Sequence, residues 1–146
     1  MISFTLKQVL AVHERAIQKY GGSSGIRDTS MLQSAIFRPF ATFDGQDLYP
    51  DIFLKAGALI QSIVKNHPFI DGNKRTAFIT TYNFLSLNGV KITAREKEIV
   101  KFMVSVANQN LSVDEISSWL KSNGYMLVVS RIKVRMLTKS KEDVIK

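Results

Sequence analysis

The sequence predicts an all-α domain, a bundle of about six helices with one short β-hairpin. Apolar residues recur at helical spacing along most of the chain, Gly and Pro residues interrupt that spacing, and capping residues stand where the segments begin. The 146 residues fit a single domain, and 45% apolar content with 22% charged residues predicts a folded chain.

Two capped segments open the chain. Thr5 is placed to cap a first helix, which Gly21 ends because glycine readily adopts the positive φ needed after a helix. Asp28 is placed to cap a second helix, and Pro39 terminates it because the residue before a proline avoids helical geometry. We therefore expect two short helices before residue 40.

The next segment predicts a turn and then a buried helix. Asp44-Gly45, between apolar residues, is a signal for a short hairpin. Pro50 suits the first position of a helix, and residues 52–66 are apolar on nearly every face of the helix that they predict. Such a helix belongs at the centre of a bundle.

Three more helices are expected in the second half of the chain. Residues 73–88 form a mostly apolar segment, Thr93 is placed to cap a fifth helix, and Ser112 begins a capping box that opens a sixth. Residues 126–137 alternate partly as a strand would, amid Arg and Lys, so they fit either a strand or a basic helix.

Composition excludes several classes of function. The chain has no cysteine, which rules out a disulfide scaffold, a thiol nucleophile and a thiolate metal site. It has no signal-peptide pattern and no apolar stretch of membrane length, so we expect a soluble, cytoplasmic protein without membrane contact. Half of the net charge of +8 lies in residues 125–146, so the basic balance belongs to the end of the chain.

Chemistry-bearing residues concentrate in one loop between two nearly all-apolar helices, His-Pro-Phe-Ile-Asp-Gly-Asn-Lys-Arg over 67–75. Polar groups between buried elements are costly unless they are used or well satisfied. His67 is the one side chain there that can accept a proton near neutral pH, and Asp71 offers the kind of oxygen ligand that suits Mg²⁺. Phe69 is expected to anchor the loop in the core.

The start of the following helix predicts an anion site. Gly72 permits the backbone to turn with positive φ. The N–H groups of Asn73, Lys74 and Arg75 then lie at the positive end of the helix dipole. Cations are unfavourable there unless an anion binds, so the two basic side chains indicate a phosphate ligand. A base, a metal ligand and an anion nest together indicate phosphoryl or nucleotidyl transfer.

The loop resembles the Fic-type motif His-x-Phe-x-Asp/Glu-Gly-Asn-x-Arg at every specified position. Its surroundings resemble the death-on-curing toxins of that family through Gly21-Gly22, Gly25-Ile26-Arg27-Asp28, Leu32, Ser34-Ala35, Pro39, Tyr49-Pro50, Lys55-Ala56 and Asn73-Lys74-Arg75-Thr76-Ala77. The resemblance covers roughly residues 3–124. It implies a Fic-like catalytic domain over 1–124 followed by a basic extension over 125–146.

The resemblance also implies roles for the loop residues. It makes His67 the base that deprotonates an incoming hydroxyl and Asp71 the ligand of Mg²⁺. The groups that it assigns to the phosphates of ATP are Gly72, Asn73, Lys74 and Arg75. The catalytic set that it implies is His67, Asp71, Asn73 and Arg75.

Two departures from the motif of nucleotidyl-transferring Fic enzymes indicate a subtype. Those enzymes usually have Gly where Lys74 stands and a second Arg where Phe78 stands. Both changes resemble the death-on-curing branch, which transfers the γ-phosphate of ATP to a threonine of elongation factor Tu and halts translation. The resemblance further implies a toxin–antitoxin system, in which the disordered tail of an antitoxin folds into a groove on the toxin. Contact with nucleic acid is then indirect, through the antitoxin complex.

Outside the loop, the resemblance implies one element that would bind the protein substrate. The remaining notable residues are expected to have structural roles only. Residues 43–49 resemble the flap that aligns a target peptide beside the site by strand addition. The inhibitory motif Ser/Thr-x-x-x-Glu-Gly/Asn is incomplete near the end of the chain, where Asp143 occupies its last position, so we expect no self-inhibition. His13 is expected to be a bystander on a surface helix, and Trp119 a core residue.

Two other functions fit the sequence. The same loop could transfer AMP to a protein hydroxyl. Alternatively, residues 125–146 could bind the phosphates of a nucleic acid, and the protein would then be a non-catalytic module. The two enzyme functions depend on His67, whereas the binding module depends on the basic end of the chain.

Overall fold

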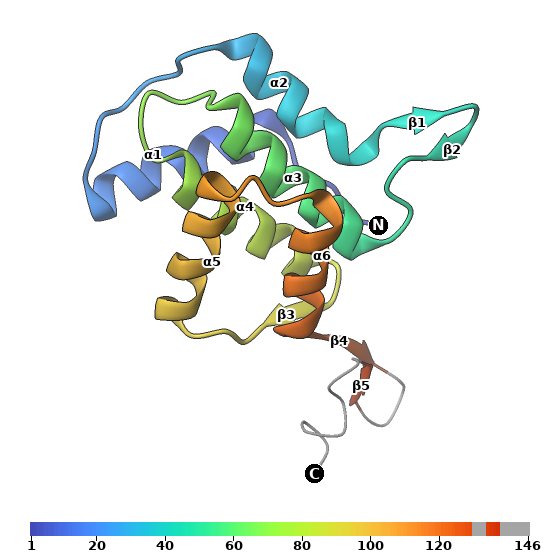
Figure 1. Ribbon diagram of the computed structural model, residues 1–146. Helices are drawn as coiled ribbons and strands as arrows, with labels where there is room; N and C mark the ends of the chain where they lie inside the picture. The colour runs from blue at the N-terminus through green and yellow to red at the C-terminus, as the bar shows by residue number, and fades with distance from the viewer. Residues whose placement is uncertain (130–133, 138–146) are drawn as a thin grey trace.

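The computed structural model describes residues 1–129 and 134–137 (Figure 1). Helices make up most of the described chain: α1 (Leu6–Tyr20), α2 (Thr29–Phe37), α3 (Ile52–Asn66), α4 (Asn73–Leu87), α5 (Glu96–Asn108) and α6 (Val113–Ser122). A short 3₁₀ turn, η1 (Arg38–Phe40), follows α2. The predicted all-α class is confirmed. Within the described residues, no helix is both long and apolar enough to cross a membrane.

The starts of four helices depend on side-chain caps. The predicted caps Thr5, Asp28 and Ser112 accept hydrogen bonds from backbone N–H groups in the first turns of α1, α2 and α6. Helix α3 spans the predicted residues 52–66, but Pro50 is not its first residue, because Pro50 lies outside the helix and Asp51 is its cap. Aspartate is the better cap because its carboxylate binds a first-turn N–H that would otherwise have no partner.

Helix α3 is the central element, as its apolar sequence predicts. It runs through the middle of the bundle (Figure 1) and packs against α2, α4, α5 and α6. The largest fully buried side chains of this main core include Leu59, Ile60, Ile63, Leu85, Ile116 and Leu120, which come from α3, α4 and α6. Between α5 and α6, Trp119 stacks on Phe102 with ring centroids 3.9 Å apart, which confirms its core role.

The predicted hairpin is present but lies far from the loop that carries the candidate chemistry. Strands β1 (Thr42–Phe43) and β2 (Gln46–Asp47) pair through a turn with positive φ at Asp44 and Gly45. The hairpin precedes the amino end of α3, whereas the loop 67–72 follows its carboxyl end (Figure 1). Helix α3, which is about 22 Å long, runs between these two places. The role of residues 43–49 as a flap that aligns a target peptide stays a prediction.

A second sheet was not predicted. Strands β3 (Val90–Ile92), β4 (Gly124–Val129) and β5 (Val134–Leu137) form an antiparallel sheet in the order β3-β4-β5. This pairing corrects the predicted start of the fifth helix. The Thr93 N–H donates to the Asn123 carbonyl oxygen at 2.8 Å, so Thr93 continues the strand region and α5 begins three residues later.

The end of the chain is described in part. The segment 126–137, which fits a strand or a basic helix by sequence, is strand over its described residues. Residues 130–133 and 138–146 lie outside the described residues, and so does the incomplete inhibitory motif that ends at Asp143. The division between a catalytic domain over 1–124 and an extension over 125–146 stays a prediction.

Candidate active site

The loop 67–72 joins α3 to α4 at one end of the bundle. His67 follows the last turn of α3 in the left-handed conformation, with φ 48° and ψ 54°, and its N–H donates to the Ile63 carbonyl oxygen at 3.1 Å. This conformation costs a residue other than glycine on the order of 1 kcal/mol, so other contacts must maintain it. Pro68 ends the helix because proline has no N–H to continue it.

A segment before α2, residues 23–27, runs beside the loop and binds its backbone. The Ile70 N–H donates to the Gly25 carbonyl oxygen at 3.1 Å, and the Arg27 N–H donates to the Pro68 carbonyl oxygen at 2.6 Å. These bonds follow the antiparallel pattern of two paired strands. The loop therefore has a defined path although it belongs to no sheet.

Phe69 anchors the loop in the core, as predicted. It is fully buried, and its ring stacks on the His13 ring with centroids 3.8 Å apart and 6° between the planes. The expected surface position of His13 is wrong, because His13 is only 3% exposed and faces the loop from α1. Its Nε2 donates to the Asp71 carbonyl oxygen at 2.8 Å, so the ring fixes the loop at two points.

The Asn73 side chain closes the loop. Its Oδ1 accepts a hydrogen bond from the Phe69 N–H, and its Nδ2 donates to the Phe69 carbonyl oxygen, both at 2.9 Å. The side chain is 5% exposed, and both of its polar atoms have partners within the loop. It therefore maintains the shape of the loop, and its backbone N–H is the group that an anion nest can use.

The Asp71 carboxylate is exposed and held by two backbone groups. Its Oδ2 accepts from the Ser23 N–H at 3.1 Å, and its Oδ1 accepts from the Gly72 N–H at 2.8 Å. These two bonds, with smaller contributions from the charges of Arg75 and His13, hold the pKa of Asp71 below its usual value. The carboxylate is therefore ionised at neutral pH.

The Asp71 carboxylate fits a Mg²⁺ site that is completed by substrate phosphates. In the described part of the chain, no group of three or more His, Cys, Asp or Glu side chains gathers around a common point. Asp71 keeps lone pairs on both oxygens beyond the bonds from Ser23 and Gly72. Such a residue fits Mg²⁺, which commonly takes one or two carboxylates and completes its shell with substrate phosphates and water.

The first turn of α4 provides the anion nest. Gly72 has φ 76° and caps α4 without a side-chain bond. Its N–H already binds the preceding carboxylate. The nest is therefore formed by the N–H groups of Asn73, Lys74 and Arg75, which have no acceptor within the helix because they belong to its first turn.

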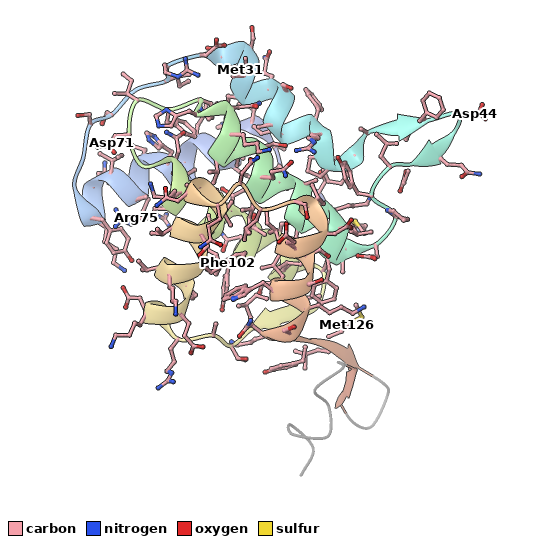
Figure 2. All side chains as sticks on the ribbon, in the orientation of Figure 1. Met31, Asp44, Asp71, Arg75, Phe102 and Met126 are labelled. Carbon is pink, nitrogen blue, oxygen red and sulfur yellow. The ribbon has the colours of Figure 1, made fainter. Side chains whose placement is uncertain are left out.

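All the predicted site residues come together at one hollow of about 280 Å³, lined by Val64, His67, Asp71, Gly72, Asn73, Lys74, Arg75 and Ala107. Asp71 and Arg75 lie on the same side of the molecule (Figure 2). The Arg75 guanidinium carbon lies 4.2 Å from the centroid of the Tyr20 ring, a cation–π contact with α1. The hollow thus combines an imidazole, an ionised carboxylate, oriented amides and two cations, which are the groups that phosphate transfer requires.

Sequence reasoning missed the residues that support the loop from other elements, namely His13, Tyr20, Ser23 and Arg27. They precede the loop by some 40 to 60 positions in the sequence, and no local spacing connects them to it. The one available signal was the run Gly25-Ile26-Arg27-Asp28, which carried part of the family resemblance without indicating a role.

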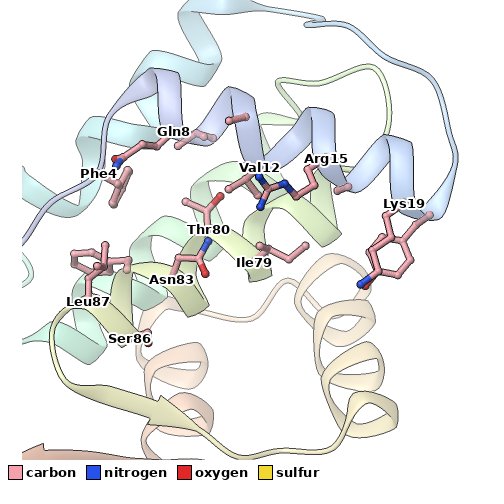
Figure 3. Close-up of a pocket in the computed structure, with 15 residues that line it drawn as sticks. Phe4, Gln8, Val12, Arg15, Lys19, Ile79, Thr80, Asn83, Ser86 and Leu87 are labelled. Carbon is pink, nitrogen blue, oxygen red and sulfur yellow. The ribbon is translucent and has the colours of Figure 1, made fainter.

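A larger groove of about 590 Å³ lies between α1 and α4 (Figure 3). Its lining is mostly apolar and includes Phe4, Val9, Val12, Ala16, Ile79, Phe84 and Leu87. The buried Thr80 hydroxyl has no partner among the described residues, and Arg15 and Lys19 add positive charge. Tyr20, which carries the Arg75 guanidinium on its ring, also lines this groove, so the groove extends to the edge of the site.

A helical bundle whose central helix ends in this His-x-Phe-x-Asp-Gly-Asn-x-Arg loop defines a Fic-type protein. The chain belongs to the Fic/DOC family, whose sequence model matches residues 3–85. It is similar to "Toxin Doc" of Mycolicibacterium smegmatis, with 40% identity over 106 residues that cover 69% of this chain and 79% of that protein. It is also similar to "Protein kinase doc" of Escherichia phage P1, with 28% identity over 115 residues that cover 79% of this chain and 90% of that protein.

Proposed function

We propose that this protein is a toxin with protein kinase activity, which transfers the γ-phosphate of ATP to a hydroxyl of a translation factor and halts protein synthesis. By resemblance, the target is elongation factor Tu. The observation that carries the proposal is the hollow that His67 shares with the amide nest of residues 73–75. The names of the two relatives, a toxin and a protein kinase, support the same activity here.

In the proposed reaction, His67 accepts the proton of the target hydroxyl while the hydroxyl oxygen attacks the γ-phosphorus. The bond from the γ-phosphorus to its bridging oxygen breaks, and ADP leaves with that electron pair. The amides of residues 73–75, with the Lys74 and Arg75 side chains, bind the phosphates and stabilise the developing charge. Asp71 would hold Mg²⁺, which neutralises phosphate charge when bound.

The surroundings of Phe78 favour phosphate transfer over AMP transfer. Fic enzymes that transfer AMP usually have a second Arg at this position. Here Phe78 packs against the main core, and its ring centroid lies 6.3 Å from that of Tyr82. Position 78 therefore offers no second cation to the phosphates, and Lys74 supplies charge from a different place in the nest.

Labelled ATP tests the reaction type. The protein is incubated with elongation factor Tu and ATP labelled at either the γ or the α phosphate, with and without Mg²⁺. We expect label on the factor from the γ position alone, and only with Mg²⁺ present. Label from the α position would overturn phosphate transfer in favour of AMP transfer. Absence of label from both positions, together with toxicity that survives His67→Ala but not deletion of residues 125–146, would favour the nucleic-acid-binding module.

Two lysines at equivalent helix positions test the nest. Lys74 is the second residue of α4, and Lys97 is the second residue of α5. We expect Lys74→Ala to raise KM for ATP about tenfold, because a charge-assisted bond to phosphate is lost. Lys97→Ala removes the same charge from the same helical position outside the hollow, and should leave KM for ATP unchanged. Equal effects of the two variants would contradict the nest.

We further infer that a cognate antitoxin binds the groove between α1 and α4 through a disordered tail that folds on binding. The groove offers apolar surface to an amphipathic segment, and Arg15 and Lys19 favour acidic residues in that segment. Co-expression with the small protein encoded beside this gene tests this. Val12→Asp in the groove should abolish protection of cell growth, whereas Val104→Asp on the exposed face of α5 should not. Full protection with Val12→Asp would exclude this groove.

A further inference from the structure

The carboxyl end of α3 needs hydrogen-bond donors that the adjoining chain cannot supply. The last carbonyl groups of any helix have no partner within it. Pro68 has no N–H to donate back to the last turn, and His67 takes the left-handed conformation that glycine usually provides at this place. The carbonyl groups of Asn66 and His67 therefore depend on donors from elsewhere.

The Arg27 side chain supplies those donors. Its Nε donates to the His67 carbonyl oxygen at 2.6 Å, and its Nη2 donates to the Asn66 carbonyl oxygen at 2.7 Å. A guanidinium is a planar fork, so two of its N–H groups can bind two consecutive carbonyl groups at once. Its positive charge also lies at the negative end of the α3 dipole.

The backbone of Arg27 is fixed against the same turn. Its own N–H donates to the Pro68 carbonyl oxygen at 2.6 Å, and the Asp28 N–H donates to the same oxygen at 3.1 Å. Arg27 therefore binds the carbonyl groups of both His67 and Pro68, one through its side chain and one through its backbone. Asp28 in turn caps α2, so the segment that carries Arg27 is tied to a helix.

We propose that Arg27 is a positioning residue for His67. By binding the carbonyl oxygens of both Asn66 and His67, it holds the peptide planes on the two sides of the His67 Cα atom, and these planes set the direction of the Cα–Cβ bond that carries the imidazole. Without those bonds, His67 relaxes toward the extended conformation preferred by a residue before proline, and its ring leaves the hollow. This inference rests on the proposed role of His67 as the base.

The test compares Arg27→Ala and Arg27→Lys with Lys65→Ala, each as the full-length protein. Lys65 also places a cation in the last turn of α3, so its variant reports the loss of charge alone. We expect Arg27→Ala to lower kcat for phosphate transfer about 10–100-fold with KM for ATP unchanged, because a misplaced base slows chemistry without disturbing the nest. Arg27→Lys should recover part of kcat, guanidinium ion added to Arg27→Ala should recover more, and Lys65→Ala should resemble the wild type.

A second measurement does not depend on activity. NMR resonances of the His67 ring and amide should shift and broaden in Arg27→Ala and stay unchanged in Lys65→Ala. Unaltered His67 resonances in Arg27→Ala would overturn the inference, and so would equal losses of kcat in Arg27→Ala and Lys65→Ala. If the wild type transfers no phosphate, the proposed function fails, while the NMR comparison still decides whether Arg27 sets the conformation of His67.

Discussion

His13 Nε2 lies 2.8 Å from the Asp71 carbonyl oxygen, and this contact connects α1 to the loop that carries the candidate chemistry. A carbonyl oxygen only accepts hydrogen bonds, so Nε2 carries the proton and donates it. The same ring stacks on Phe69. The buried His13 side chain therefore supports the loop, although it belongs to α1, some 50 residues earlier in the sequence.

The first prediction separates the two contacts of that ring. His13→Phe retains an aromatic ring to stack on Phe69 and removes the donor to Asp71. We expect the free energy of unfolding to fall by about 1 kcal/mol, the typical net contribution of one hydrogen bond, and the rate of phosphate transfer to fall as well. Urea unfolding measures the first quantity. Glu14→Gln, at the exposed neighbouring position, is the control and should change neither quantity. Identical behaviour of the two variants would contradict this role of His13.

The second prediction concerns the space beside the Asp71 carboxylate. A Cβ at Gly22 would lie 2.6 Å from Asp71 Oδ2, whereas a Cβ at Gly21 would have no atom within 4 Å. Both glycines have positive φ, so alanine strains the backbone at either position, but only Gly22→Ala displaces the carboxylate. We expect Gly22→Ala to need a higher Mg²⁺ concentration for half-maximal transfer than Gly21→Ala. Matching Mg²⁺ titrations for the two variants would remove Asp71 from the metal site.

The third prediction follows from the lowered pKa of Asp71. The N–H groups of Ser23 and Gly72 bind the ionised carboxylate, so this group stabilises the folded state above its unfolded pKa of about 3.9 and loses that contribution as pH falls through its lower folded pKa. Wild type should therefore be more stable than Asp71→Asn by a constant amount near neutral pH. The difference in the free energy of unfolding should shrink below about pH 4. A difference that grows as the pH falls would contradict this sign.

The helices and the loop could be predicted from the sequence because their signals are local. Thr5, Asp28 and Ser112 stand within three residues of the N–H groups that they cap. The β3–β4 pairing could not be predicted in this way, because Ile92 and Gly124 are distant in the sequence and neither segment alternates clearly. The missed sheet also explains the wrong start of α5.

The residues of the candidate site could be predicted from the sequence. The residues from other elements that hold the loop in place could not. The motif residues from His67 to Arg75 adjoin one another, so one helix start brings them to the same hollow. The contacts of His13 and Arg27 with the loop arise only when α1 and the segment before α2 pack against it. Such long-range contacts leave no periodicity in the sequence, and only the folded chain reveals them.

The most direct test of His67 as the base is the rate of phosphate transfer to elongation factor Tu by His67→Ala, measured beside its affinity for Mg²⁺-ATP. We expect a rate about 10²–10⁴-fold below that of the wild type, because the imidazole removes the proton of the attacking hydroxyl. We expect unchanged nucleotide affinity, because backbone amides and cations of residues 73–75 bind the phosphates. A His67→Ala protein that transfers phosphate at a rate close to that of the wild type would contradict catalysis by this imidazole.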